Sequence, residues 1–228
     1  MLKSFGCSFV FGTDLADDGR GHASASASQL TWPAHLARYF EQDYICYARP
    51  GAGNLSIADR VLSHAASPGD DIYVINWTYI DRFDYGMNQT PWDRDWSTLR
   101  PGEKSEENKF YFSHLQGDYR DKLNALIVIK TCIDTLVQRN IPYMMTYMDH
   151  LIFDTQYHCS PAISLLQQHA KHYLRNFQGR NFVEWSRDHD YAISDTEHPL
   201  EQAHEAAAKH IIANQSDFFH NLKGVQNV

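Results

Sequence analysis

Short apolar-rich segments that alternate with helical segments constrain the fold of this chain more than any other feature. Asp71–Trp77 is the clearest of them, because its run of β-branched and aromatic residues suits a strand covered on both faces. Leu2–Phe5 is shorter and begins almost at the first residue. Strands that alternate with helices are typical of βαβ units. They predict a mostly parallel sheet with helices on both faces.

The predicted elements extend along the whole chain. The predicted strands are Leu2–Phe5, Tyr44–Ala48, Asp71–Trp77, Ile141–Tyr147 and Phe182–Trp185. Thr31-Trp32-Pro33 opens the first predicted helix. The other predicted helices are Leu55–Ala66, Asp118–Asn140, Pro161–Phe177 and Pro199–Phe219. Right-handed crossovers leave few topologies for this order. We therefore expect one domain over residues 1–228, a three-layer α/β/α sandwich with a flavodoxin-like, mostly parallel sheet of about five strands.

Composition narrows the classes of protein to which this chain can belong. The hydrophobic fraction of 43% is ample for a core, and a net charge of -8 without a block of Lys and Arg excludes a nucleic-acid footprint. No signal peptide or membrane-length apolar stretch is visible, so we expect a cytoplasmic protein without a membrane partner. The four cysteines lie far apart and are interpreted as reduced thiols, with two disulfides as the alternative. They are Cys7, Cys46, Cys132 and Cys159.

Two short motifs carry residue types that acyl-transfer chemistry needs. Gly6-Cys7-Ser8 follows the first strand and can expose a serine hydroxyl at the carboxyl edge of the sheet. A serine needs a base, and Asp195-Thr196-Glu197-His198-Pro199 offers a histidine with an acid three residues earlier. The alternative is that Ser8 is an ordinary turn residue and His198 an ordinary residue at a helix start.

Two further blocks are expected at the same edge. Gly51-Ala52-Gly53-Asn54 follows the second predicted strand, and Asn76-Trp77-Thr78 ends the third. Three of the four blocks lie at the ends of predicted strands, and the fourth precedes the last predicted helix. In a parallel sheet all four are therefore expected at the carboxyl edge. The two glycines could also serve only the turn.

The order and spacing of these blocks resemble the SGNH hydrolase superfamily, also called GDSL-like esterases, over nearly the whole chain. The resemblance implies that Ser8 is the nucleophile, His198 the general base and Asp195 the acid that orients it. It also implies that the backbone N–H groups of Ser8 and Gly53 form an oxyanion hole. No metal and no cofactor are implied.

The sequence departs from the family pattern in two places. Cys7 stands where the family has an Asp before the serine. The third block offers Thr78, or Asn76 if the register slips, as the side-chain oxyanion donor. Loss of such a donor typically costs ~3–4 kcal/mol of transition-state stabilisation. Two functions follow: a serine esterase that cleaves a short-acyl or O-acetyl ester of a carbohydrate or small molecule, or a catalytically weak binding or structural protein with the same fold.

Residues 79–117 form an aromatic-rich insertion that is too long for a simple connection. The insertion follows the third block, so we expect it beside the site, as a wall or lid that sets substrate size. The candidate wall residues are Tyr79, Phe83, Trp92 and Trp96. The alternative is packing on the helix predicted at Asp118–Asn140 or on a neighbouring subunit, and the oligomeric state stays open.

A cluster of polar residues after the fourth strand matches no metal-binding spacing, so we interpret it as an ordinary loop rather than a metal site. Its members are Asp149, His150, Asp154, His158 and Cys159.

Overall fold

The computed structural model describes residues 1–18, 26–86 and 96–222. Its strands are β1 (Leu2–Phe5), β2 (Tyr44–Cys46), β3 (Ile72–Trp77), β4 (Phe83–Gly86), β5 (Trp96–Leu99), β6 (Tyr143–Tyr147), β7 (Leu174–Arg175) and β8 (Phe219–His220). Its helices are α1 (Ser8–Phe11), α2 (Trp32–Tyr39), α3 (Asn54–Ala65), α4 (Glu106–Phe110), α5 (Asp118–Gln138), α6 (Pro161–Lys171), α7 (Phe182–Asp188), α8 (Glu201–Ala213) and α9 (Gln215–Phe218). A π-helical turn covers Tyr111–Leu115 and a 3₁₀ turn covers His150–Ile152.

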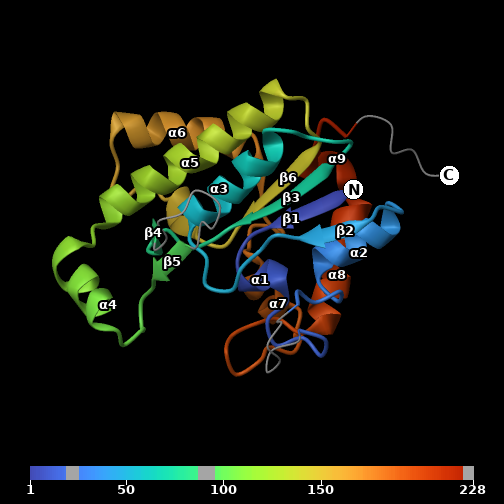
Figure 1. The fold of residues 1–228 in the computed structure, drawn as a ribbon, viewed down its shortest axis with the longest axis horizontal. Helices are drawn as coiled ribbons and strands as arrows, with labels where there is room; N and C mark the ends of the chain where they lie inside the picture. Colours follow the sequence, from blue (N-terminus) through green and yellow to red (C-terminus); the bar gives the residue numbers. More distant parts are fainter. Residues whose placement is uncertain (19–25, 87–95, 223–228) are drawn as a thin grey trace.

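The central sheet has the strand order β2-β1-β3-β6-β7, and every neighbouring pair along this path is parallel. β8 adds an antiparallel strand against β6, so the sheet has six strands rather than the predicted five. Helices α3, α5 and α6 cover one face, and α2 and α8 cover the other (Figure 1). The prediction of a three-layer, mostly parallel α/β fold is confirmed.

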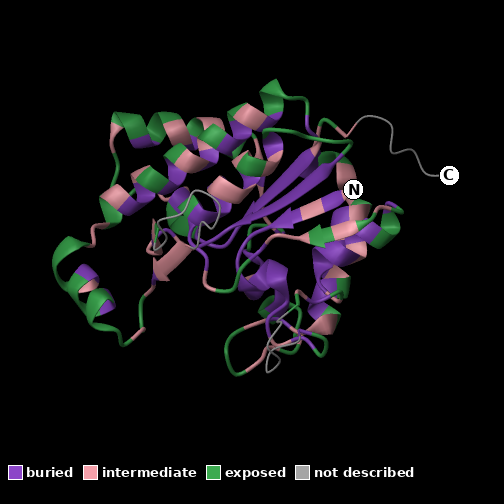
Figure 2. Cartoon of the chain, viewed as in Figure 1, coloured by how far each residue is buried: buried purple, intermediate pink, exposed green. Residues whose placement is uncertain are grey.

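The buried residues explain why the strands occupy the middle layer. Every residue of β3 and β6 is buried, as both faces of these strands are covered by helices (Figure 2). Edge strand β2 has no fully buried residue. Among the described helices, none combines the length and the apolar composition needed to cross a membrane.

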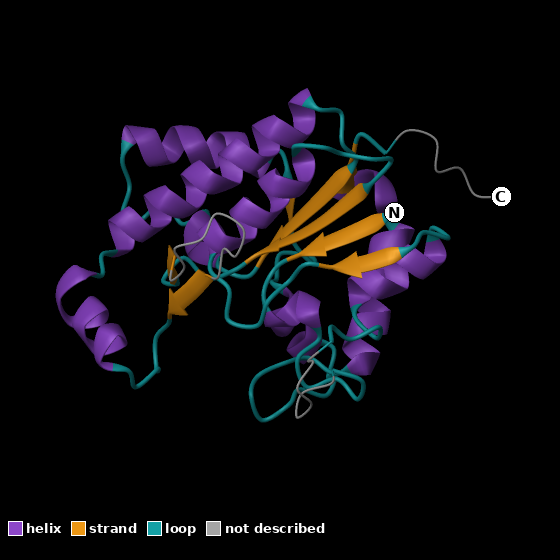
Figure 3. Cartoon of the chain, in the orientation of Figure 1, coloured by secondary structure: helices purple, strands orange, loops and turns teal. Residues whose placement is uncertain are grey.

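The last predicted strand is wrong. Phe182–Trp185 belongs to α7, and a capping box starts this helix: the Asn181 side chain accepts from Glu184 N–H, and the Glu184 carboxylate accepts from Asn181 N–H. The fifth parallel strand is instead the two-residue β7, which lies inside the predicted helix Pro161–Phe177. Figure 3 shows the strands of the central sheet between the layers of helices.

A buried histidine joins the two helices on one face of the sheet. His204 of α8 is 1% exposed, and its Nδ1 accepts a hydrogen bond of 3.1 Å from Trp32 N–H at the start of α2. Burial, with a smaller contribution from His35, lowers the pKa of His204 to about 3. His204 is therefore neutral in the folded protein throughout the range in which an exposed histidine becomes protonated.

This burial predicts a pH-dependent stability. Below pH ~6.5 the unfolded chain binds a proton at His204 that the folded chain does not, so unfolding becomes easier by up to about 1.4 kcal/mol per pH unit. The stability that neutral His204 contributes to the folded protein is complete above pH ~6.5 and is lost as the pH falls toward 3. His204→Asn, which keeps an acceptor near Trp32 N–H, should flatten the pH dependence of the urea-unfolding free energy between pH 6.5 and 4.5. The matched control is the exposed His172→Asn, and an equal slope in both variants would contradict the assignment.

Candidate functional site

Ser8 is the first residue of α1, directly after β1 at the carboxyl edge of the sheet (Figure 1). It is 7% exposed, and within the described ranges its hydroxyl forms no hydrogen bond. Gly6 makes this sharp entry into α1 possible. A Cβ at Gly6 would lie 2.8 Å from Val10 Cγ2 and 3.1 Å from the backbone oxygen of Asn76. The sequence-predicted nucleophile thus lies where the predicted strand order places it.

Two left-handed residues reverse the chain immediately after α1. Gly12 has φ 85°, and a Cβ there would lie 2.5 Å from the Ser28 Cβ, so only glycine fits. Asp14 has φ 73°, a conformation that Asp tolerates better than most residues. Its N–H donates to Asp18 Oδ2 at 2.8 Å, which holds the turn. The turn carries the Asp14 carboxylate to the segment that contains His198.

The Asp14 carboxylate receives several donors from that segment. His198 Nδ1 lies 2.9 Å from Asp14 Oδ2, and Ser194 Oγ donates to the same oxygen at 2.7 Å. Thr196 Oγ1 also donates to Asp14 Oδ2 and lies 2.9 Å from His198 Nδ1. The side chains of His198 and Asp14 are only 14% and 21% exposed. A carboxylate at Nδ1 favours the tautomer whose Nε2 can accept a proton.

His198 lies in a closed turn rather than in a helix. Ser194 N–H donates to His198 O at 2.8 Å, and His198 N–H donates to Ser194 Oγ at 3.1 Å. The His198 ring lies against Phe9, the residue after Ser8, with 5.2 Å between ring centroids. The nucleophile candidate and the base candidate are therefore neighbours, although Ser8 Oγ and His198 do not form a hydrogen bond. Such bonds are often long in the absence of substrate.

Asp195 does not occupy the position predicted for it. The structure leaves this residue exposed and brings the carboxylate of Asp14 to His198 Nδ1 instead. The cause is local: α8 begins only at Glu201, so Asp195 and His198 do not share a helical face. Residues 194–198 form a closed turn in which Glu197 has φ 69° and Asp195 is exposed. Sequence reasoning missed Asp14 because only the fold brings residues 14 and 198 together.

The predicted oxyanion donor Gly53 N–H already has a partner. It donates to Asp84 Oδ1 at 2.9 Å, Ser56 N–H donates to Asp84 Oδ2 at 2.8 Å, and Thr98 Oγ1 donates to Asp84 Oδ1 at 2.6 Å. A Cβ at Gly53 would lie 2.5 Å from this carboxylate, which explains the glycine. Burial raises the pKa of Asp84, and the three hydrogen bonds act in the opposite direction. Asp84, in the insertion, thus caps α3, and no sequence signal pointed to it.

The third block separates into two differently placed side chains. Asn76 Nδ2 donates to Thr146 Oγ1 at 2.7 Å between β3 and β6, so its amide serves the sheet. Thr78 is fully buried, and its Oγ1 has no hydrogen-bond partner among the described residues. Asn54, which the sequence reasoning left without a role, binds Thr78 through both backbone groups: Thr78 N–H donates to Asn54 Oδ1 at 2.9 Å, and Asn54 Nδ2 donates to Thr78 O at 3.2 Å.

The described part of the insertion reaches the carboxyl edge of the sheet, where Asp84 accepts hydrogen bonds from Gly53 and Ser56 (Figure 1). Phe83 stacks on Tyr111 at 4.6 Å, and Trp96 Nε1 donates to Asp59 Oδ2 at 3.0 Å on α3. Tyr79 follows β3 and is half-buried, and burial raises the pKa of its hydroxyl. Trp92 lies outside the described residues. Part of the insertion packs on α5, since Tyr111 Oη donates to Asp121 Oδ1 at 3.4 Å.

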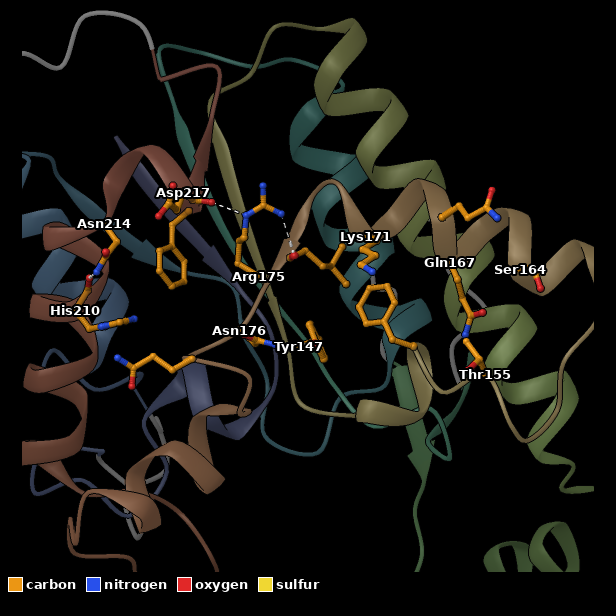
Figure 4. A pocket seen from close by; sticks show the side chains of 15 residues that line it. Tyr147, Thr155, Ser164, Gln167, Lys171, Arg175, Asn176, His210, Asn214 and Asp217 are labelled. Carbon is orange, nitrogen blue, oxygen red and sulfur yellow. Dashed lines mark hydrogen bonds between the residues drawn. The ribbon is translucent and has the colours of Figure 1, made fainter.

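A cavity of about 780 Å³ lies away from these residues, between α6 and the α8–α9 segment (Figure 4). Ser164 and His210 both line it, but they lie on opposite walls and form no nucleophile–base pair. Asn176 Nδ2 donates to Tyr147 Oη at 3.0 Å, and Arg175 Nε donates to Asp217 O. Neither Ser8 nor His198 lines this cavity.

Two side chains of the polar cluster after β6 form hydrogen bonds with protein groups. His150 Nε2 lies 2.6 Å from Glu184 Oε2, and Asp154 Oδ1 accepts from the N–H groups of Gln156 and Tyr157. Across residues 1–18, 26–86 and 96–222, no group of three or more His, Cys, Asp or Glu side chains could hold a metal ion.

Solved structures share this architecture. The chain superposes on an acetyl xylan esterase, Est2A, from the rumen bacterium Butyrivibrio proteoclasticus with a TM-score of 0.52 at 14% identity, covering 93% of this chain and 62% of that one. The chain also superposes with a TM-score of 0.50 at 14% identity on a carbohydrate esterase whose active site displays divergent catalytic and non-catalytic binding functions. The match covers 98% of this chain and 69% of that one. The TM-score is 0.48 at 10% identity for a member of the lipolytic protein G-D-S-L family from Veillonella parvula DSM 2008, with 93% of this chain and 96% of that one covered.

At the level of sequence, no protein-family model matches the chain, and comparison with curated proteins finds no match. The structural likeness at 14% identity concerns the fold alone. The fold expected from the four sequence blocks, that of the SGNH hydrolases and carbohydrate esterases, is the fold of this chain.

Proposed function

We propose that this chain is a serine esterase that cleaves a short-acyl or O-acetyl ester, with Ser8 as nucleophile, His198 as general base and Asp14 as the acid that orients His198. The observation that carries the proposal is the 2.9 Å contact between His198 Nδ1 and Asp14 Oδ2, beside the helix that Ser8 begins. This arrangement supplies a nucleophile, a base and an orienting acid at one edge of the sheet.

In the proposed reaction, Ser8 Oγ attacks the acyl carbonyl carbon while His198 Nε2 takes its proton. The negative oxygen that develops needs donors, and the Ser8 N–H and the Thr78 hydroxyl are the two candidates without a partner in the described part of the chain. His198 then protonates the leaving alcohol. Water, deprotonated by His198, hydrolyses the acyl-enzyme.

The hydrogen bond that Gly53 N–H makes to Asp84 supports a second function. Because Gly53 N–H donates to Asp84, it is not directed at a substrate oxygen in this arrangement. Loss of one such donor typically lowers the rate by about 10²- to 10³-fold. A binding or structural protein that has this fold and is catalytically weak is therefore the alternative.

The substrate proposal is a carbohydrate or small-molecule ester. Two neighbours of the same fold are described as an acetyl xylan esterase and a carbohydrate esterase. The extra aromatic residues of the insertion, Tyr79, Phe83 and Trp96 among them, remain candidates for the wall of the substrate pocket.

A fluorophosphonate probe separates the two functions. An esterase should acquire one phosphonyl group on Ser8, because the activated hydroxyl attacks phosphorus, and peptide mass spectrometry should locate the adduct. Heat-denatured protein is the control and should stay unlabelled. Native protein that stays unlabelled at Ser8 would favour the binding or structural function.

A further inference from the structure

A cavity of about 320 Å³ lies beside the Arg49–Gly53 loop and is lined by three arginines. Arg49 comes from the loop itself, Arg60 from α3 and Arg100 from the segment after β5. Among the described residues, no Asp or Glu lines it. The chain carries a net charge of -8, so three guanidinium groups around one cavity do not follow from its composition. We call it the arginine cavity.

The heads of two of these arginines are held by neighbouring groups. Arg60 Nη1 donates to Ser56 Oγ at 2.9 Å. Arg100 pairs with Glu103 through Nε at 2.7 Å, and its Nη1 lies 2.5 Å from where a Cβ on Gly51 would stand. Gly51 has φ 80°, so this position favours glycine on two grounds. The close approach sets the Arg100 guanidinium against the loop backbone.

Arg49 differs from the other two. It is exposed, and neither an ion pair nor a side-chain hydrogen bond joins it to any described residue. Three acids of the described residues in this region have other partners: Asp84 caps α3, Glu103 pairs with Arg100, and Asp59 accepts from Trp96. The charge of Arg60 acts to lower the pKa of Asp84, so this carboxylate offsets part of the positive charge of Arg60.

The arginine cavity adjoins the candidate active site through the backbone. Arg49 N–H donates at 3.1 Å to the backbone oxygen of Gly6, two residues before Ser8. Gly51 and Ala52 line the cavity and lead directly to Gly53. A molecule with an ester group at Ser8 could therefore extend into this cavity.

We propose that the arginine cavity binds a phosphate group, carried in the substrate on the part of the molecule that lies beside the ester. Guanidinium groups match phosphate geometry through paired N–H donors, and several of them suit a doubly charged oxyanion better than a carboxylate. The assignment of the phosphate to an ester substrate rests on the proposed function. The binding of phosphate itself does not.

Calorimetric titration of the whole chain with inorganic phosphate, at constant ionic strength, tests the site without any reaction. Acetate is the reference for a singly charged carboxylate and should bind at least tenfold more weakly. Arg49→Gln should weaken phosphate binding at least tenfold, and Arg49→Lys should restore part of it, since charge returns without the paired donors. The matched control is Arg139→Gln: Arg139 lies exposed at the opposite edge of the sheet, bound to Ala66 O, and its loss should change nothing.

Two results would overturn the site: no phosphate binding by the wild-type chain, or equal binding by Arg49→Gln and Arg139→Gln. A second measurement compares kcat/KM for an acetyl ester of a phosphorylated alcohol with that for its neutral analogue. Arg49→Gln should lower this ratio at least tenfold. If neither ester is cleaved while the binding results hold, the esterase function fails and the phosphate site stands. If both are cleaved with a ratio that Arg49→Gln leaves unchanged, the substrate assignment is refuted.

Discussion

Replacing Ser8 by alanine is expected to lower kcat for a short p-nitrophenyl ester by about 10³-fold or more, because the acyl group then has no nucleophile to receive it. The thermal transition should hardly move. Ser8 is 7% exposed, its hydroxyl bonds to no described residue, and alanine suits the first turn of a helix. The measurement is initial-rate kinetics beside a melting curve for each protein.

The matched control for this substitution is Ser67→Ala. Ser67 is an exposed residue after α3, at the opposite edge of the sheet, and its hydroxyl contacts no described residue. It should retain full activity. Ester hydrolysis by Ser8→Ala at the rate of the wild type would exclude Ser8 as the nucleophile.

Asp14→Asn is expected to lower kcat by about 10²- to 10⁴-fold with little change in KM, because an amide no longer selects the productive tautomer of His198. The acidic limb of the pH–rate profile should also move to lower pH, since a neighbouring carboxylate favours the protonated imidazole. A purely structural role for Asp14 would leave that limb in place. Asp14 also accepts from Ser194 and Thr196, so a melting curve must accompany the kinetics.

Asp195→Asn is the control for this substitution. It separates the acid that contacts His198 in the structure, Asp14, from the acid that the family resemblance implies, Asp195. Asp195 is exposed in the turn, whereas Asp14 contacts His198 Nδ1. The Asp195 variant should keep its rate within about twofold, the range of a surface substitution. A large loss at position 195 together with a small loss at position 14 would reverse the assignment.

The fold could be predicted because its signals are local. The buried strands β3 and β6 are rich in apolar, aromatic and β-branched residues, and α2 and α3 follow turn residues in the sequence. The prediction failed where a local signal was ambiguous. Phe182–Trp185 has strand-like residue types, yet the Asn181–Glu184 capping box makes it a helix. β7 has only two residues and is a strand only because it pairs with β6.

The sequence alone predicted β1, β2, β3 and β6 with α2, α3 and α5 between them, and therefore which blocks would meet at the carboxyl edge of the sheet. It also indicated Ser8 and His198 through their spacing from neighbouring elements. Which acid reaches His198 was decided by tertiary structure, because Asp14 and His198 are 184 residues apart and meet through the turn at Gly12 and Asp14. The same holds for Asp84, which reaches Gly53 only because the β4–β5 hairpin packs on α3. Hydrogen bonds between distant segments depend on where the packed core places them, and no spacing along the chain encodes that.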